Sequence, residues 1–242
     1  MIKRILVIIS LVLLVFALVP FVLDIVPLEA LSGTAGEYVE EGPETLGAGN
    51  LVTAVVVTYR GLDTVGEVAV LFLAASGVGL LLKRKSTDKD ERPRNTQHSD
   101  RGSSEILRTA SGFLMPLLIL FGTYIFMHGH LTPGGGFQGG VVIASAFLLV
   151  FLSRPDGKAG HAALEAVESL SGTAYVAAGI LGLVFAAGFL DSRLLPLGEF
   201  GRLLSAGSIP IVYSLIGLKV GSELTSVLDT LRSGKTGPGG SP

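Results

Sequence analysis

The sequence of 242 residues contains no cysteine and few charged residues. Without cysteine, the chain cannot form a disulfide, ligate an iron–sulfur cluster through cysteine or attach a c-type haem covalently. Charged residues make up only 16% of the chain and hydrophobic residues 49%, whereas a soluble domain of this length needs more charge to cover its surface. The composition therefore predicts a membrane protein that holds no cysteine-based redox centre of its own.

Neither a nucleic-acid interface nor a cofactor or metal site is indicated. The basic residues form no patch with interleaved aromatic residues. Gly134, Gly136 and Gly139 match the spacing G-x-G-x-x-G, but no strand precedes them and no βαβ unit surrounds them. His128 and His130 are of a metal-ligating type, yet no third cysteine, histidine or carboxylate lies nearby. We therefore predict no catalytic, cofactor-binding or metal-binding residue in this chain, and no nucleic-acid partner.

Long apolar runs dominate the sequence, and each approaches the roughly 20 residues that cross a bilayer as a helix. Six runs are expected to span the membrane: residues 5–23, 65–82, 109–128, 137–153, 169–190 and 206–221. The first run also fits a signal peptide, but its core is long and no small-residue cleavage site ends it. Residues 50–59 are apolar but short, which favours an interfacial or re-entrant helix and leaves a seventh crossing open. The predicted fold class is an all-α integral membrane protein with about six transmembrane helices.

The distribution of charge predicts the orientation and the organisation of the chain. Residues 83–108 carry eight lysines and arginines, whereas residues 24–59 carry acidic residues and no basic one. Basic loops stay in the cytoplasm, so we expect residues 83–108 and both termini on the cytoplasmic side of the plasma membrane. We divide the chain into a two-helix unit (1–85), a flexible linker (86–104), a four-helix unit (105–225) and a disordered tail (226–242).

The stretch from His128 to Gly140 is the most unusual part of the sequence, and it lies between the third and fourth predicted spans. Its motif residues are Pro133, Gly134, Gly135, Gly136, Phe137, Gln138, Gly139 and Gly140. So many glycines indicate non-helical backbone, whose amides need protein or water as partners at membrane depth. Two interpretations stay open: a wet, partly re-entrant loop in which His128 and His130 exchange protons, or a packing corner in which the histidines cap helix ends.

Ionisable residues at the predicted spans are the remaining candidates for an ion pathway, because charge is costly in lipid. Asp63 and Glu67 lie one turn apart at the start of the second span, and Lys219 and Glu223 lie one turn apart near the end of the sixth. Members of a proton or sodium relay have this placement. Long side chains that mark the ends of spans and reach the interface have it too. The ion-pathway candidates are thus Asp63, Glu67, His128, His130 and Lys219.

The stretch from Gly122 to Gly140, G-T-Y-I-F-M-H-G-H-L-T-P-G-G-G-F-Q-G-G, resembles the B-type subunit (MnhB or MrpB) of the multisubunit Na+/H+ antiporters. The resemblance covers about residues 105–225. It implies a non-catalytic membrane subunit that contributes to sodium and proton translocation and to assembly. The implied partners are the other membrane subunits of the complex, the lipid bilayer, and the Na+ and H+ that pass through the complex.

The first unit is similar to another part of the same systems. Residues 50–67, ending in Y-R-G-L-D-T-V-G-E, resemble the small E-type subunit of archaeal membrane-bound hydrogenases, which corresponds to the C-terminal end of the large MnhA-type subunit of the antiporters. Here this part precedes the MnhB-like part, unlike the common bacterial arrangement. The resemblance therefore also implies an alternative, the ion-pumping arm of a ferredoxin-dependent hydrogenase or sulfur-reducing complex. In that case the complex, although not this chain, is an oxidoreductase.

Overall fold

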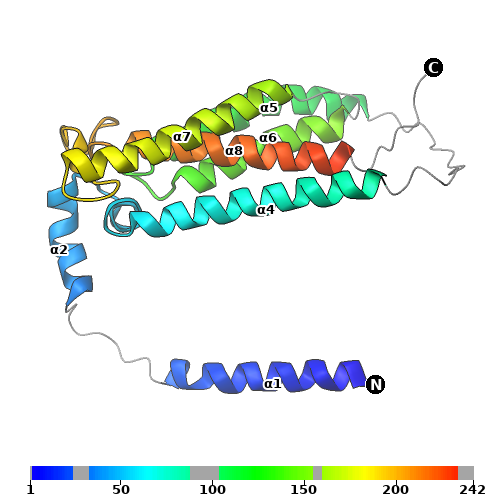
Figure 1. Cartoon of the computed structure of the whole chain (residues 1–242), viewed down its shortest axis with the longest axis horizontal. Coiled ribbons are helices and arrows are strands. Elements are labelled where there is room, and N and C mark those ends of the chain that lie inside the picture. Colours follow the sequence, from blue (N-terminus) through cyan, green and yellow to red (C-terminus); the bar gives the residue numbers. More distant parts are fainter. Residues whose placement is uncertain (1, 24–32, 88–103, 155–159, 234–242) are drawn as a thin grey trace, which may run out of the picture. The chain divides into compact units, whose positions relative to one another are not determined.

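The computed structural model describes residues 2–23, 33–87, 104–154 and 160–233, and within these ranges every regular element is a helix. Figure 1 shows these helices in the order of the chain. The elements are α1 (Ile2–Leu23), α2 (Thr34–Leu46), α3 (Leu51–Thr53), η1 (Ala54–Tyr59), α4 (Gly61–Thr87), α5 (Glu105–Met127), α6 (Gly136–Ser153), α7 (His161–Phe185), η2 (Ser192–Leu194) and α8 (Ile209–Ser233). Most of the predicted linker lies outside the described residues.

Five of these helices, α4 to α8, are long and apolar enough to cross a membrane. Helix α1 carries a shorter apolar stretch, Ile5–Pro20, whose large side chains are exposed. An exposed apolar surface of this length suits a helix surrounded by lipid. The prediction of an all-α, multi-pass membrane protein is confirmed, and α4 to α8 correspond to five of the six expected spans, whereas a crossing by α1 stays a prediction.

The chain forms two compact units, Met1–Glu37 and Tyr38–Pro242. In the larger unit α8 is the central helix, because α4, α5, α6 and α7 all pack against it. Its buried residues Ile209, Val212, Ile216 and Val220 form the core together with side chains from the surrounding elements. Lipid is as apolar as these side chains, so close packing rather than burial from water has to hold such helices together.

Glycines provide that close packing between α5, α6 and α8. A Cβ atom at Gly122 of α5 would lie 2.7 Å from the carbonyl oxygen of Gly139 on α6, and a Cβ at Gly140 would lie 2.8 Å from that of Gly217 on α8. These distances are shorter than any ordinary carbon–oxygen contact. The glycines of the predicted motif therefore allow α6 to approach both neighbours backbone to backbone.

The boundaries of α7 and α8 differ from the sequence prediction. Helix α7 begins at His161 and ends at Phe185, whereas the apolar run predicted residues 169–190. Glu165 and Glu168 near its N-terminus lower the local hydropathy, so a prediction from apolar runs places the start of the helix too late. Helix α8 continues to Ser233, so residues 226–233 are helical and do not belong to a disordered tail. Residues 234–242 lie outside the described residues.

The short apolar segment before α4 consists of α3 and the π-helix η1. Its residues Thr53, Ala54 and Val57 are buried, and the Thr64 hydroxyl donates to the Val56 carbonyl oxygen at 2.9 Å. The wider hydrogen-bonding pattern of a π-helix interrupts the regular α-helical hydrogen bonds of the backbone. Such turns are rare in proteins. This segment packs into the larger unit by its buried side chains, and its interfacial or re-entrant placement stays a prediction.

Candidate ion-handling site

Lys219 lies between two carboxylates inside the helical bundle. Its Nζ atom is 3.2 Å from Oε2 of Glu223, one turn further along α8, and 3.7 Å from Oε1 of Glu168 on α7. The side chain of Glu223 is 1% exposed and that of Lys219 is 10% exposed. Buried charges are costly unless they are paired, and both carboxylates lie within ion-pair distance of the ammonium.

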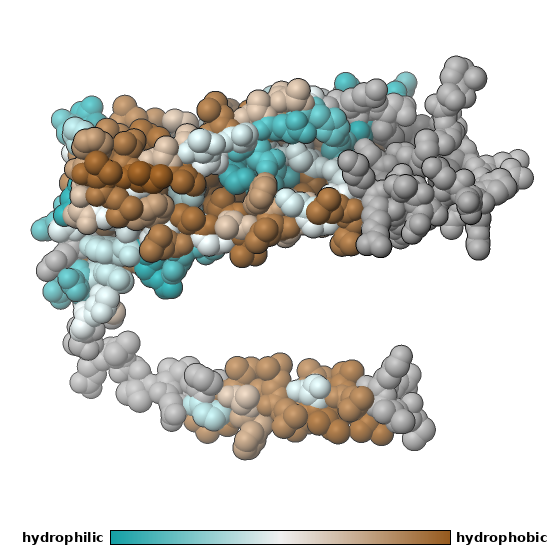
Figure 2. All heavy atoms as spheres, viewed as in Figure 1, coloured by the Kyte–Doolittle hydropathy of each residue, from teal (hydrophilic) through white to brown (hydrophobic). Residues whose placement is uncertain are grey.

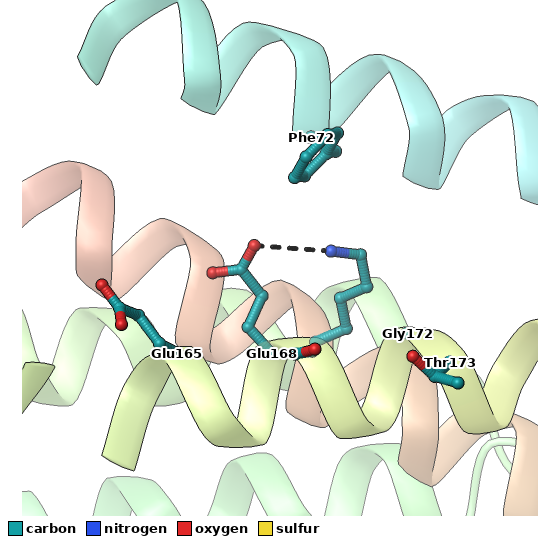
Figure 3. A pocket seen from close by; sticks show the side chains of 7 residues that line it. Phe72, Glu165, Glu168, Gly172 and Thr173 are labelled. Atoms are coloured by element: carbon teal, nitrogen blue, oxygen red, sulfur yellow. Dashed lines mark ion pairs between the residues drawn. The ribbon is translucent and has the colours of Figure 1, made fainter. Parts of the chain in front are cut away.

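A cavity of about 310 Å³ opens onto this cluster between α4, α7 and α8. Figure 3 shows Glu168 reaching from α7 toward the ammonium, with Phe72 of α4 on the opposite side of the cavity. The Lys219 ammonium lies 5.2 Å from the centre of the Phe72 ring, within range of a cation–π interaction. Figure 2 shows hydrophilic residues midway along the largely hydrophobic bundle. The cavity therefore connects a charged cluster with the surface of the larger unit.

Local sequence places each member of this cluster. Lys219 and Glu223 are four residues apart, so they lie on the same face of α8. The early start of α7 puts Glu165 and Glu168 on one helical face, three residues apart, beside α8. Gly172, one turn further along α7, leaves room for the lysine, because a Cβ there would lie 3.2 Å from its Cδ atom.

The glycine-rich corner is closely packed and bonded to the segment that precedes α4. The Asn50 side-chain amide donates to the carbonyl oxygens of Gly129 and Thr132, at 2.8 and 3.0 Å. The Thr53 hydroxyl donates to the same Gly129 oxygen at 2.6 Å and accepts a bond of 3.1 Å from the Tyr213 hydroxyl. The backbone amide of Asn50 donates to the carbonyl oxygen of His130. Protein groups thus satisfy several polar backbone atoms of this corner, which favours the packing interpretation.

The two histidines of this corner have different surroundings. His128 ends α5, where its ring stacks on Tyr124 and its Nδ1 lies 3.2 Å from the Tyr124 carbonyl oxygen. His130 is fully buried, and its Nε2 lies 3.2 Å from the Arg202 carbonyl oxygen. Burial lowers the pKa of His130 below its ordinary value, and the bond to Arg202 opposes this effect in part. A neutral, bonded His130 is suited to holding the corner in place, and the ion-pathway role of both histidines stays a prediction.

Asp63 and Glu67 both lie on exposed positions of α4. Asp63 forms an ion pair with Arg60, three residues before it. Glu67 lies within electrostatic range of the Tyr175 and Tyr213 hydroxyls. Within the part of the chain that the structure describes, no hydrogen bond or ion pair joins Glu67 to His128 or His130. The structure thus brings Lys219 into a charged cluster but does not bond the other four candidates to it.

Sequence reasoning assigned no role to Glu168 and left open whether Glu223 belongs to a relay or marks the end of a span. Neither residue was placed inside a span, because spans were predicted from hydropathy and acidic residues lower the hydropathy of a segment. The usable signal was the helical spacing of Glu165 and Glu168, one turn apart and continuous with the apolar run that follows. A search for helix starts rather than apolar runs would have placed Glu168 inside α7.

Comparison with known proteins identifies the family. Residues 106–226 match the family described as a domain related to the MnhB subunit of Na+/H+ antiporter, and this range contains the glycine-rich corner and the Lys219 cluster. The chain belongs to this MnhB-related family. The resemblance predicted from residues 122–140 is therefore confirmed.

Two curated relatives match this chain over very different shares of their own length. The uncharacterized protein MJ1307 of Methanocaldococcus jannaschii is 30% identical in an alignment of 197 residues that covers 73% of this chain and 74% of that protein. A protein of Rhizobium meliloti, named as a probable K(+)/H(+) antiporter A/B subunit, is 30% identical over 136 residues, 49% of this chain but 14% of that protein. The chain therefore corresponds to a small part of this second, much longer relative.

Two solved structures share the fold across almost the whole chain. A chain of the membrane-bound sulfane sulfur reductase, an archaeal respiratory membrane complex, is 42% identical with a TM-score of 0.78, covering 96% of this chain and 98% of that one. A chain of the Mrp complex from Dietzia sp. DQ12-45-1b is 25% identical with a TM-score of 0.69, covering 95% of this chain but 26% of that one. Chains that share this fold thus occur in both of these membrane complexes.

Proposed function

We propose that the chain is a non-catalytic membrane subunit of an Mrp-type Na+/H+ antiporter complex, contributing to sodium and proton translocation and to assembly. The observation that carries this proposal is the MnhB-related family match over residues 106–226. The fold shared with a chain of the Mrp complex supports it. Because this chain spans 26% of that chain, it corresponds to one part of a larger antiporter protein, and other membrane subunits supply the rest.

A second candidate function is the same role in the membrane arm of a redox-driven ion pump. It is favoured by the match to the sulfane sulfur reductase, where both chains are covered almost end to end at 42% identity. With no cysteine in the sequence, iron–sulfur clusters of such a complex would be held by other subunits. Both candidates place this chain among membrane partners and assign it no catalysis.

The proposed orientation has residues 83–108 and both termini on the cytoplasmic side of the plasma membrane. The eight basic residues of that segment support it, because lysine and arginine near the ends of spans resist translocation. Of the ion-pathway candidates, Lys219 has the strongest structural support, since it is buried and paired with two carboxylates. For Asp63, Glu67, His128 and His130 the pathway role stays a prediction.

Purification of the tagged chain from its native membrane, followed by identification of its partners, separates the two candidates. Antiporter proteins alone, together with Na+-dependent proton movement in inverted vesicles, would support the Mrp-type function. Iron–sulfur proteins and ion pumping driven by a reductant would instead support the redox-driven pump. Recovery of the chain by itself as an active carrier would contradict both.

Deletion of the gene, with and without reintroduction of the wild-type chain, provides the control. If the chain has the proposed function, vesicles from the deletion strain lose Na+-dependent proton movement. Vesicles from cells with the reintroduced wild-type chain regain it. Unchanged movement in the deletion would contradict the proposal.

A further inference from the structure

The Lys219 cluster has an imbalance of charge. One ammonium group, on Lys219, lies within 3.7 Å of carboxylates from both Glu168 and Glu223. Helix α7 adds Glu165 at the cavity, whereas α4 contributes the uncharged Phe72 ring. Helix α6, which also packs along α8, has no ionisable side chain between its first and last residues. When all three groups of the cluster are ionised, the two carboxylates outnumber the ammonium and leave a net charge of about −1 in a low-dielectric site.

These groups form a gradient of burial from the cavity to the interior. Glu165 is exposed, the side chain of Glu168 is 21% exposed, that of Lys219 is 10% exposed and that of Glu223 is 1% exposed. The cavity of about 310 Å³ has room for several waters, each of which occupies roughly 30 Å³ in the liquid. Glu168 is therefore accessible to water, while Glu223 communicates with the cavity through Lys219.

Glu223 has capacity for a further bond. Among the described residues, Oε1 of Glu223 has no hydrogen-bond partner, and the ion-pair partner of Oε2 is the Lys219 ammonium at 3.2 Å. A buried carboxylate oxygen that lacks a hydrogen bond is costly to keep charged, and a proton on it removes that charge.

We propose that this cluster is a proton-exchange site, in which Lys219 passes one proton between Glu168 at the cavity and Glu223 in the interior. Glu168 takes a proton from cavity water and becomes a neutral carboxylic acid. The Lys219 ammonium then gives one proton to Glu223 and receives one from Glu168. The lysine ends as it began, Glu168 is again a carboxylate, and Glu223 holds the proton.

The geometry favours a proton over a sodium ion at this position. The ammonium already occupies the space between the carboxylates, and its positive charge repels a second cation at the same place. Lysine also has three equivalent N–H donors, which suits it to exchanging protons with two acceptors in turn. The site is independent of which complex contains the chain, and it rests on the proposed function only in the claim that the proton is one that the complex moves.

Infrared difference spectroscopy of the purified complex, recorded while the pH is lowered, tests this proposal. A carboxylic acid has a carbonyl band that a carboxylate lacks, so proton uptake by the cluster is directly visible. We expect a band that forms in the wild type, is lost in Glu223→Gln, and forms much more slowly after a pH jump in Glu168→Gln. The control is Glu199→Gln, which removes an exposed carboxylate of the loop between α7 and α8 and should leave the band intact.

Each other outcome overturns the proposal. Bands that are the same in Glu168→Gln, Glu223→Gln and the wild type would show that no proton binds here. A wild-type band whose size depends on Na+ concentration, with this dependence lost in both variants, would identify a sodium site instead. Where a single variant does not assemble, the pair Lys219→Met and Glu223→Gln removes both buried charges together. Failure of that pair to assemble would show that the cluster serves to hold the bundle together.

Discussion

At the scale of single residues, Asp191 organises the loop between α7 and α8. Its buried carboxylate accepts hydrogen bonds from the backbone amides of Ala187 and Arg193, at 3.2 and 2.9 Å, and from the Arg193 guanidinium at 2.6 Å. The side-chain bond from Arg193 is the largest cause that holds the pKa of Asp191 below its ordinary value. The charged form of Asp191 is thus the form that the folded loop favours.

This lowered pKa predicts a loss of loop stability in acid. Because the folded pKa is below the unfolded value of about 3.9, the stabilisation is fully present above that value and is lost as the pH falls through the folded pKa. We expect amide-exchange protection of residues 187–193, corrected for the intrinsic rate, to decrease below about pH 4 in the wild type. Asp191→Asn should already show reduced protection at neutral pH, by about 1 kcal/mol because Arg193 is half-exposed, and little further change in acid.

Glu199→Gln is the matched variant in the same loop. Glu199 pairs with Arg202, but both side chains are exposed, and exposed pairs contribute little to stability. Its protection profile should follow the wild type. If Asp191→Asn kept the acid-dependent loss of the wild type, another group would be responsible.

At the scale of helices, the contact between α5 and α6 depends on the absence of side chains where the helices cross. Gly122 and Gly139 face each other, and a Cβ on either would meet the carbonyl oxygen of the other at 2.7 or 2.5 Å. Backbone cannot move aside as a flexible side chain does, so the helices themselves would have to separate.

Gly122→Ala should therefore destabilise the chain, by about 1–3 kcal/mol as for other overpacked sites. Gly112→Ala is the control on the same helix, because no atom lies within 4 Å of a Cβ at Gly112. Alanine is a better helix former than glycine by about 1 kcal/mol, so this control should be neutral or slightly stabilising. Thermal unfolding of the purified complexes measures both, and equal melting temperatures for the two variants would contradict the packing interpretation.

At the scale of the whole molecule, the expected orientation follows from the charge of two segments, each of which lies partly outside the described residues. The basic segment 83–108 connects α4 to α5, and the acidic segment 24–59 follows α1. The membrane potential and the insertion machinery both disfavour translocation of clustered basic residues. The two segments should therefore lie on opposite sides of the membrane.

The natural absence of cysteine allows this orientation to be measured with single introduced cysteines. In intact cells, a membrane-impermeant maleimide should label Ser32→Cys and leave Ser99→Cys unlabelled. Inverted vesicles should give the opposite result, which controls for the reactivity of each position. Labelling of Ser99→Cys from outside intact cells would reverse the proposed topology.

The sequence by itself determined the membrane class, the approximate position of the five long spans α4 to α8, and the family. The spans depend on the length of apolar runs, and the family depends on the residues of one motif around Pro133 to Gly140. Both are local properties of the sequence. Local patterns were less reliable where charge interrupts a helix, and for this reason the start of α7 and the end of α8 were misplaced.

Only the tertiary structure decided which side chains meet. Glu168 and Lys219 belong to different helices, 51 positions apart, and nothing local in either segment indicates that they pair. Their contact depends on how α7 and α8 pack, with Gly172 leaving room for the lysine stem. Which face of a helix contacts which neighbour depends on how well the two surfaces fit together. This fit involves both helices, so it cannot be read from the sequence of one of them.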